Sequence, residues 1–319
     1  MFIKQYMDTT KDINISINLN LRNDLEKFIK NKLSKEELNK LGVFPQDEQL
    51  ERIKNESLDN LITIYNGLQN RLLHGNKKVI LCDSLLKNKL YPTYNKIIYE
   101  FKDKLENGES ITNYLSNRID NLYFKDRLLQ DWNIHHLHFV PRNQDRNNSN
   151  DILFLMDDED KIYFINIMSH DDFENIDLLK YIYKQNPMIL EKYRLNGIPQ
   201  AMQISPDDIR KLRYENVDYC ISFSENTYAP SINPKSEFYL VSSLMNLHYS
   251  LKEYEKYYKE FLKQYVPAYY NSINFNWIID NKLNELKFSP NNFGKIIRIA
   301  YDDNRNIGIN NMLHELKII

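Results

Sequence analysis

The stretch that decides the fold is DILFLMDDEDKIYFINIM, residues 151–168, together with WNIHHLHFV, residues 132–140. Residues 151–156 and 161–168 are apolar at nearly consecutive positions, which is typical of strands covered on both faces. The acidic run between them, residues 157–160, predicts a hairpin turn. Residues 132–140 mix aromatic and β-branched residues with histidines and predict a further short strand. We therefore expect a central antiparallel sheet.

Helices are predicted on both sides of this sheet. Apolar residues follow a helical spacing in the first third of the chain, at Leu61, Tyr65, Leu68 and Leu72. A second helix is expected over residues 84–105, interrupted by Pro92, and a third region of helix after residue 171. Residues 218–228 predict another hairpin.

The predicted fold class is α+β, with three segments. Residues 1–109 form an N-terminal helical region, and residues 110–235 form a central α+β domain that carries the candidate catalytic residues. Residues 236–319 supply a long helix and a closing hairpin around residues 302–304. The long helix places apolar residues at alternating spacings of four and three, which indicates a coiled-coil-like seam (Leu247, Leu251, Tyr254, Tyr258, Phe261 and Tyr265).

Composition excludes several classes of function. The 319 residues contain seven glycines, no two closer than eight positions, so the glycine-rich loops that cradle nucleotide phosphates are absent. A net charge of −2 gives no global attraction to nucleic acid or membrane, so any site for a polyanion must be local. Two cysteines, no secretory leader in MFIKQYMDTTKD and a mean hydropathy of −0.61 predict a soluble, cytoplasmic protein without a membrane partner.

Four of the seven histidines fall within 36 residues around the strongest strand signals: His135, His136, His138 and His170. Strand alternation places His136 and His138 on one face, and His135 on the other face with Leu137 and Phe139. Leu137 and Phe139 should face the core, so His136 and His138 should open into a cleft. His170 closes the second strand of the hairpin and is expected at the same end of the sheet.

Three interpretations of these histidines compete. Two histidines at i and i+2, joined by a third from a neighbouring strand and by Asp171 or Asp172, could bind zinc or ferrous iron. Alternatively, the histidines could transfer protons without a metal while arginines stabilise a phosphate. They could also be structural residues at a polar sheet edge. The metal-free interpretation is favoured, because no cysteine and no suitably spaced carboxylate completes a set of metal ligands; we expect no metal and no cofactor.

The strings DRLLQDWNIHHLHFVPR (126–142), DILFLMDDEDKIYFINIMSHDDF (151–173) and ISPDDIRKLRYENVDYCISFSENTYAP (204–230) carry a resemblance. They resemble a group of uncharacterised bacterial proteins in which a W-x-IHHLHL motif precedes a strand hairpin ending in histidine. The resemblance covers roughly residues 111–230 and implies no established activity.

At the level of the fold, helices followed by an antiparallel sheet with His and Arg at strand ends are similar to the small ribonucleases that include RelE, barnase, EndoU and the RNA-cleaving colicins. This resemblance implies metal-free attack of a ribose 2′-hydroxyl on the adjacent phosphate. It implies that His136 or His138 and His170 transfer protons and that Arg142 holds the phosphate. Substrate binding then falls to His135, Arg146 and Tyr163, with Tyr163 stacking on a base.

The leading hypothesis is a metal-independent endoribonuclease-like toxin or phage-defence effector of bacteria, with RNA as substrate and an antitoxin or inhibitor protein as a possible partner. The alternative is a non-catalytic adaptor module of a defence or toxin–antitoxin system. That module would use the helix of residues 247–265, which could also join copies of the chain into a homo-oligomer. A metal-dependent hydrolase with a His-x-His site is the third hypothesis.

Overall fold

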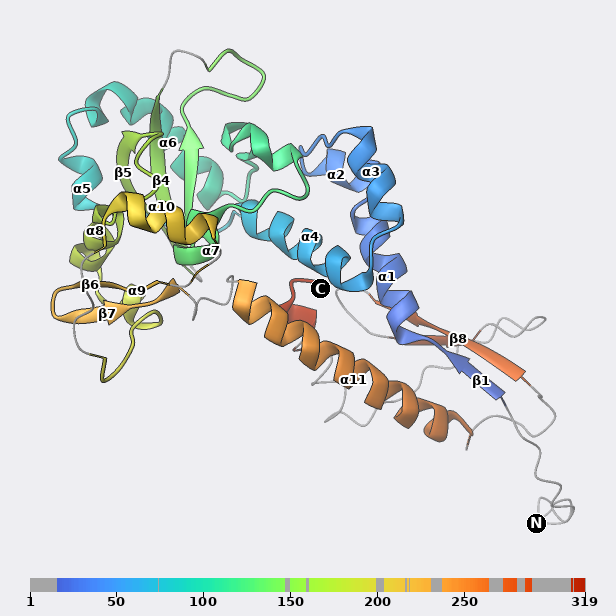
Figure 1. The fold of residues 1–319 in the computed structure, drawn as a ribbon. Coiled ribbons are helices and arrows are strands. Elements are labelled where there is room, and N and C mark those ends of the chain that lie inside the picture. Colours follow the sequence, from blue (N-terminus) through green and yellow to red (C-terminus); the bar gives the residue numbers. More distant parts are fainter. Residues whose placement is uncertain are drawn as a thin grey trace, which may run out of the picture. The chain divides into compact units, whose positions relative to one another are not determined.

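The computed structural model describes the chain with gaps, over residues 16–73, 75–146, 150–158, 161–198, 204–215, 217, 219–230, 237–263, 272–279, 285–288, 311 and 313–318. The fold is α+β, as the sequence predicts, with helices around a four-stranded mixed sheet (Figure 1). Within these residues, every helix is too short or too polar to cross a bilayer.

The chain divides into two compact units. One unit combines residues 1–31 with residues 243–319, and the other contains residues 32–242. The divisions therefore fall at 31/32 and 242/243, whereas the sequence placed them at 109/110 and 235/236. The difference arises because a strand at residues 16–19 pairs with a strand at residues 272–278, a contact between distant segments that local patterns do not reveal.

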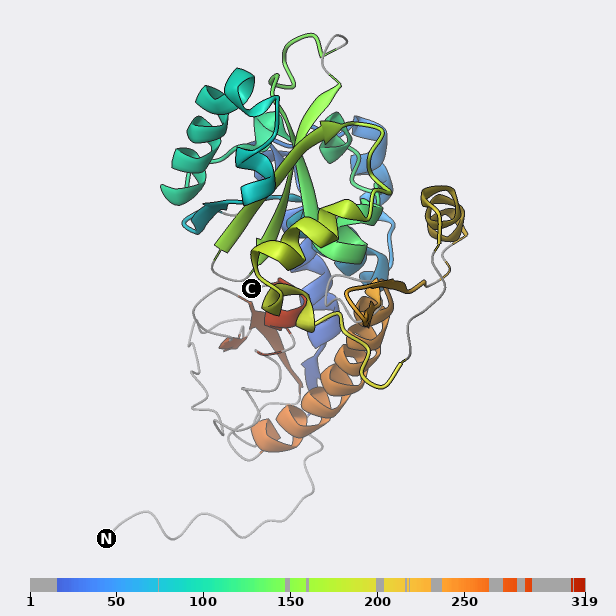
Figure 2. The same cartoon turned by 90° about the vertical axis from the view of Figure 1, so that its left-hand side faces the viewer.

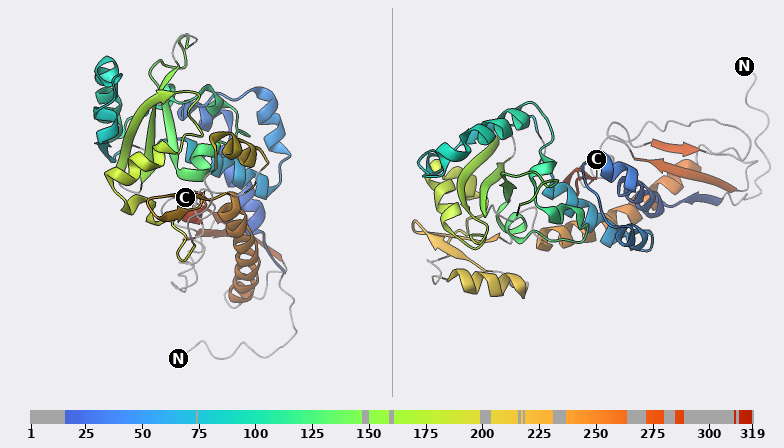
Figure 3. Two further views of the ribbon diagram at one scale, coloured as in Figure 1. Left: turned by 60° about the vertical axis from the view of Figure 1, so that its left-hand side comes forward. Right: turned by 90° about the horizontal axis from the view of Figure 1, so that it is seen from above.

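The smaller unit contains its own sheet, in the order β1-β8-β9 (Figure 3, right). Strand β1 (Ser16–Leu19) runs parallel to β8 (Ser272–Ile278), and β8 pairs antiparallel with β9 (Glu285–Phe288). Helix α1 (Leu21–Lys32) follows β1 directly. The hairpin predicted around residues 302–304 lies outside the described residues.

Helix α11 (Glu237–Lys263) contains the predicted apolar seam up to Phe261, and Tyr265 lies outside the described residues. Leu247, Leu251 and Tyr258 are at most 5% exposed, so the chain itself covers this face of the helix. Phe261 is only partly buried, and Leu262, beside it, takes the buried position at 1% exposed. Leu247, Leu251 and Tyr258 are therefore core residues, and they give no support to an oligomer through this helix.

The larger unit is built on the sheet β2-β5-β4-β3 (Figure 2). Strands β3 (Ile134–His138), β4 (Asp151–Asp158) and β5 (Lys161–Ser169) are antiparallel neighbours, as predicted from their sequences. The fourth strand, β2 (Lys78–Leu81), was not predicted and pairs parallel with β5, which makes the sheet mixed. Only four residues form it, too few to produce a clear alternation.

Helices cover both faces of this sheet. The N-terminal part of the unit contains α2 (Lys35–Lys40), α3 (Asp47–Lys54), α4 (Leu58–Arg71), α5 (Asp83–Leu86) and α6 (Tyr91–Glu106). The helix predicted over residues 84–105 is interrupted as expected, because α5 ends at Leu86 and α6 starts at Tyr91. Pro92 lies in the first turn of α6, where a residue needs no backbone N–H. Two 3₁₀ turns (Thr112–Tyr114 and Asn117–Asp120) lead to α7 (Arg127–Trp132).

The remaining elements follow the hairpin β4–β5. They are α8 (Asp177–Gln185), α9 (Met188–Glu191), α10 (Pro206–Tyr214) and the hairpin β6 (Ile221–Phe223) with β7 (Asn226–Tyr228), which confirms the hairpin predicted over residues 218–228. Figures 1 and 2 show α8 on one face of the sheet and α6 on the other.

The two faces of β3 bury different side chains. Ile134 belongs to a fully buried apolar cluster with Phe154 of β4 and Ile182 of α8. On the other face, the Phe139 ring just beyond β3 stacks on Tyr94 of α6, with the ring centroids 3.9 Å apart. This alternation places His136 and His138 on the same face as Ile134.

Candidate functional site

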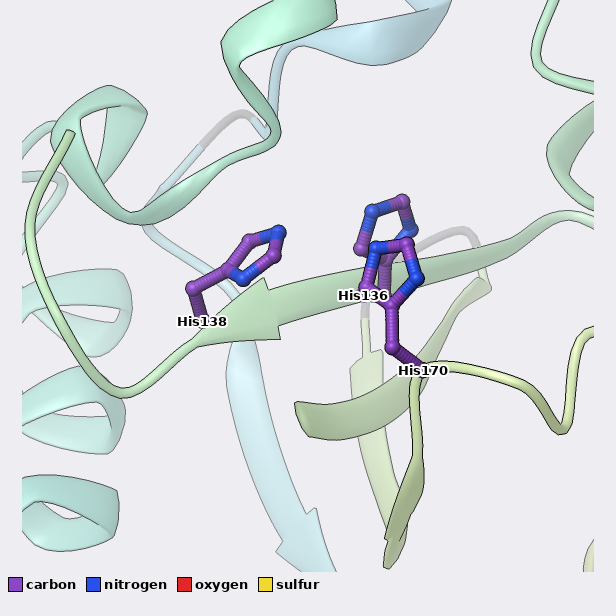
Figure 4. Close-up of side chains that lie close together, drawn as sticks. All are labelled: His136, His138 and His170. Carbon is purple, nitrogen blue, oxygen red and sulfur yellow. The ribbon is translucent and has the colours of Figure 1, made fainter. Parts of the chain in front are cut away.

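The three histidines His136, His138 and His170 meet at one end of the sheet, as predicted (Figure 4). Their ring centroids are 5.6 Å apart for His136 and His138, 6.0 Å for His136 and His170, and 5.5 Å for His138 and His170. One nitrogen of each ring lies within 4.8 Å of one nitrogen of both others. We call these three residues the histidine cluster.

Local backbone geometry places each histidine. Asn133 adopts a left-handed conformation (φ 58°) at the end of α7, and this reversal lets β3 start at the next residue. His136 and His138 then share a face because they are two positions apart. His170 follows the end of β5, where its backbone N–H donates to the carbonyl oxygen of Asn150 at 2.8 Å. The neighbouring strands β4 and β5 thus carry His170 to the cluster.

The three histidines of the cluster differ in their exposure to solvent. His136 is 7% exposed, His138 is partly buried and His170 is exposed. Burial, reinforced by the charges of His170 and Arg146, lowers the pKa of His136 from 6.5 to about 3. Burial and Arg146 also lower the pKa of His138 to about 3. Both imidazoles are therefore neutral at pH 7 and offer a nitrogen lone pair.

The carboxylate of Asp126 lies close to the ring of His136. Oδ2 of Asp126 is 4.0 Å from Nδ1 of His136, and the Asp126 side chain is 14% exposed. Its other oxygen, Oδ1, accepts from the backbone N–H of Leu129 at 3.2 Å and so caps α7. Burial raises the pKa of Asp126. The sequence analysis missed Asp126, although an aspartate just before an apolar helix start indicates a cap.

Phe173 packs against two members of the cluster. Its ring lies edge-to-face with the rings of His136 and His170, at centroid distances of 4.9 and 5.0 Å. Arg213 of α10 holds it in place, because its Nη1 donates to the carbonyl oxygen of Phe173 at 3.0 Å. The same guanidinium is paired with Asp131 through Nε, at 2.7 Å. The imidazoles thus have an apolar wall that is anchored by an ion pair.

The cluster opens on a cavity of about 840 Å³ in the larger unit. His136, His170 and Phe173 line it, and α10 borders it on one side. Its charged lining comprises five cationic and three anionic residues: Arg118, Lys125, Arg127, Arg210 and Arg213 against Asp126, Asp171 and Glu174. The chain has a net charge of −2, so this cavity is a local region of positive excess.

Arg118 is the cavity arginine that acts most directly on the cluster. Its side chain is exposed, its guanidinium lies 5.1 Å from the ring centroid of Phe124, and its charge contributes to the lowered pKa of His136. Sequence analysis did not identify it, because nothing local distinguishes it from other surface arginines. Its segment is held by the buried Arg71, whose guanidinium donates to the carbonyl oxygen of Asn121 at 2.8 Å.

The two arginines predicted to bind substrate have structural partners. Arg142 donates to Oδ1 of Asp120 at 2.9 Å and to the carbonyl oxygen of Gly42, and it does not line the cavity. Arg146 donates to the carbonyl oxygens of Val140 and Leu115 at 2.8 and 3.0 Å. Both side chains thus fix the loops beside β3. Arg146 still influences the cluster, because its charge lowers the pKa of His136 and His138.

Two other predicted binding residues are buried away from the cavity lining. His135 is 3% exposed on the opposite face of β3, as the alternation requires, so it is not placed to bind the same substrate as the cluster. Tyr163 is 5% exposed within the apolar cluster of the sheet and is not placed to stack on a base. It lies on a central strand between β2 and β4, where neighbouring elements cover both faces.

The two carboxylates considered as metal ligands, Asp171 and Asp172, have different surroundings. Asp171 lines the cavity and is exposed. Asp172 is used locally, because its Oδ2 accepts from the backbone N–H of Ser169 at 3.0 Å. The three imidazoles therefore form the donor set by themselves, with Asp171 near the opening.

Comparison with known proteins gives no match from which a function could be assigned, so the assignment depends on the chemistry of this site. No protein family matches the chain, and neither a curated protein nor a solved structure shows significant similarity to it.

Proposed function

We propose that the chain cleaves phosphodiester bonds of RNA in the cavity beside the histidine cluster. The observation that carries this proposal is a cluster of three imidazoles, two of which (His136 and His170) line a cavity with an excess of arginine and lysine. Imidazoles supply the groups that activate an attacking oxygen, and guanidinium groups stabilise the charge that develops on phosphorus.

Charge favours an anionic substrate. Arg118 is exposed, lines the cavity and lies over the ring of Phe124, so its guanidinium can meet a phosphate that enters the cavity. Arg210, which also lines the cavity, is paired with Glu174 at 3.4 Å and Asp207 at 3.2 Å, which weakens its attraction for a second phosphate. A single strand, with one phosphate beside Arg118 and the reacting phosphate beside the histidines, fits this distribution better than a duplex.

The reaction proposed for RNA is transesterification. The 2′-hydroxyl oxygen bonds to phosphorus and loses its proton, the bond from phosphorus to the 5′ oxygen breaks, and that oxygen takes up a proton. The products are a 2′,3′-cyclic phosphate and a free 5′-hydroxyl. His136 and His138 are neutral at pH 7 and offer nitrogen lone pairs at the cluster, and His170 is open to solvent.

The test is cleavage of a fluorogenic single-stranded RNA by the purified full chain. Arg118→Gln should lower kcat/KM by about 10–100-fold, since a hydrogen bond to a charged group is worth about 1.5–3 kcal/mol. Arg194→Gln is the matched control, because Arg194 also lies at the surface of the larger unit but pairs with Glu191 outside the cavity. Folded protein that leaves RNA intact would refute the proposal, as would equal losses in the two variants.

A role as a bacterial toxin or defence effector, and a partner that inhibits it, stay predictions from the sequence. Both predictions presuppose that the chain cleaves RNA, and the RNA cleavage assay tests this first.

A further inference from the structure

We propose that His136, His138 and His170 together bind one divalent transition-metal ion, zinc or a metal of similar preference. The proposal rests on the proposed function only for the use of the ion, because binding itself can be measured without substrate. It replaces the metal-free mechanism that the sequence favoured, because imidazoles bound to an ion would no longer accept protons and the ion would activate the attacking oxygen in their place.

The geometry of the cluster fits three ligands to one ion. Zinc–nitrogen bonds of about 2.1 Å in a tetrahedral site place two ligand nitrogens about 3.4 Å apart. The three nitrogens are already within 4.8 Å of one another, so side-chain rotations that shorten these separations by about 1.4 Å close the site. His170 is exposed and follows the end of a strand, so it is the ligand with most freedom to make this adjustment.

The surroundings of His136 match those of a metal-binding imidazole. Ligating histidines commonly turn their second nitrogen toward a carboxylate, which fixes the tautomer and raises the basicity of the ligand. Asp126 supplies such a carboxylate 4.0 Å from Nδ1 of His136, which leaves Nε2 for the ion. Its capping bond to Leu129 holds the carboxylate in that direction.

Three protein ligands leave a coordination position open. This is the arrangement of catalytic sites, in which water or a substrate oxygen takes the fourth position, whereas structural zinc sites use four protein ligands. The open position fits a phosphate oxygen of the proposed RNA substrate, because the cavity beside it is cationic. The bound ion would then add its charge to that of Arg118 at the reacting phosphate.

The experiment is titration of the metal-free full chain with Co²⁺, followed by competition with Zn²⁺. One Co²⁺ per chain should bind with the visible absorption of a tetrahedral site, and Zn²⁺ should displace it. His170→Ala should abolish this absorption and weaken metal binding by more than about 100-fold, because a residue that binds the ion directly contributes more affinity than a carboxylate that only orients a ligating histidine. Asp126→Asn should weaken binding by about 10–100-fold. His248→Ala is the control, because His248 lies on α11 and bonds to Arg22.

The outcomes separate this inference from the proposed function. No binding by the folded chain, or binding unchanged in His170→Ala, would overturn the metal site. RNA cleavage resistant to chelators would overturn the use of the ion in cleavage and would leave the nuclease standing. Stoichiometric binding lost in His170→Ala supports the metal site even if RNA is not cleaved. His170→Ala is the main variant because an exposed side chain can be removed with little effect on folding.

Discussion

Acid should destabilise the metal-free chain through His136, and the size of the effect follows from its burial. In the unfolded chain the pKa of His136 is 6.5, whereas burial in the folded chain lowers it to about 3. Between these values the unfolded state binds more protons, so stability is complete above pH 6.5 and is lost as the pH falls. From pH 7 to pH 5 the loss is about 2 kcal/mol, because one pKa unit corresponds to about 1.4 kcal/mol.

The assay is urea unfolding at pH 7 and pH 5 in the presence of a chelator, for the wild type and for His136→Asn. The difference between the two proteins isolates His136 from other groups that titrate. The groups around it include Asp126, whose raised pKa acts in the opposite direction, and His138, His170 and Arg146. The wild type should lose about 2 kcal/mol more than the variant between the two pH values. Equal losses would refute the reasoning that His136 is buried in the neutral form.

Three further changes test the surrounding structure. Arg142→Lys should lower the free energy of unfolding by about 1–3 kcal/mol, because an ammonium cannot bond to both Asp120 and the Gly42 carbonyl as the guanidinium does. RNA cleavage per folded molecule should not change. A loss of cleavage without a loss of stability would instead support the predicted role of Arg142 in holding the phosphate. Asn133→Ala should cost about 1–2 kcal/mol in chemical denaturation, since alanine disfavours φ 58°, and a neutral result would contradict this backbone assignment. Leu247→Ala should cost about 2–5 kcal/mol with unchanged sedimentation, whereas dissociation of an oligomer would revive the interface hypothesis.

The sheet of the larger unit could be predicted where its strands carry long apolar runs. Residues 151–156 and 161–168 indicate their strands directly, and alternation in residues 134–138 puts His136 and His138 on one face. Strand β2 was missed because four residues between helices give no periodic signal. The pairing of β1 with β8 was missed because it joins residues at opposite ends of the chain.

The candidate site could be predicted only in its histidines. The structural partners of Arg142, Asp120 and Gly42, could not be foreseen because they are 22 and 100 residues away, and a sequence does not show that a guanidinium is already engaged. Arg118 and Asp126 were missed for the same reason, since their importance comes from their position around the cavity. Tyr163 could have been excluded from the sequence, because its strand has the pattern of one covered on both faces.

The central claim is that the histidine cluster is a metal-holding centre for RNA cleavage, and restoration of cleavage in the metal-free chain tests it most directly. The rate of cleavage of a single-stranded RNA would be followed while Zn²⁺ or Co²⁺ is added to the chelator-treated chain. We predict that cleavage is absent without metal, rises until one equivalent is bound, and stays absent in His170→Ala at the same metal content. Folded chain that cleaves no RNA at any metal content, or that cleaves it equally without metal, would contradict the account.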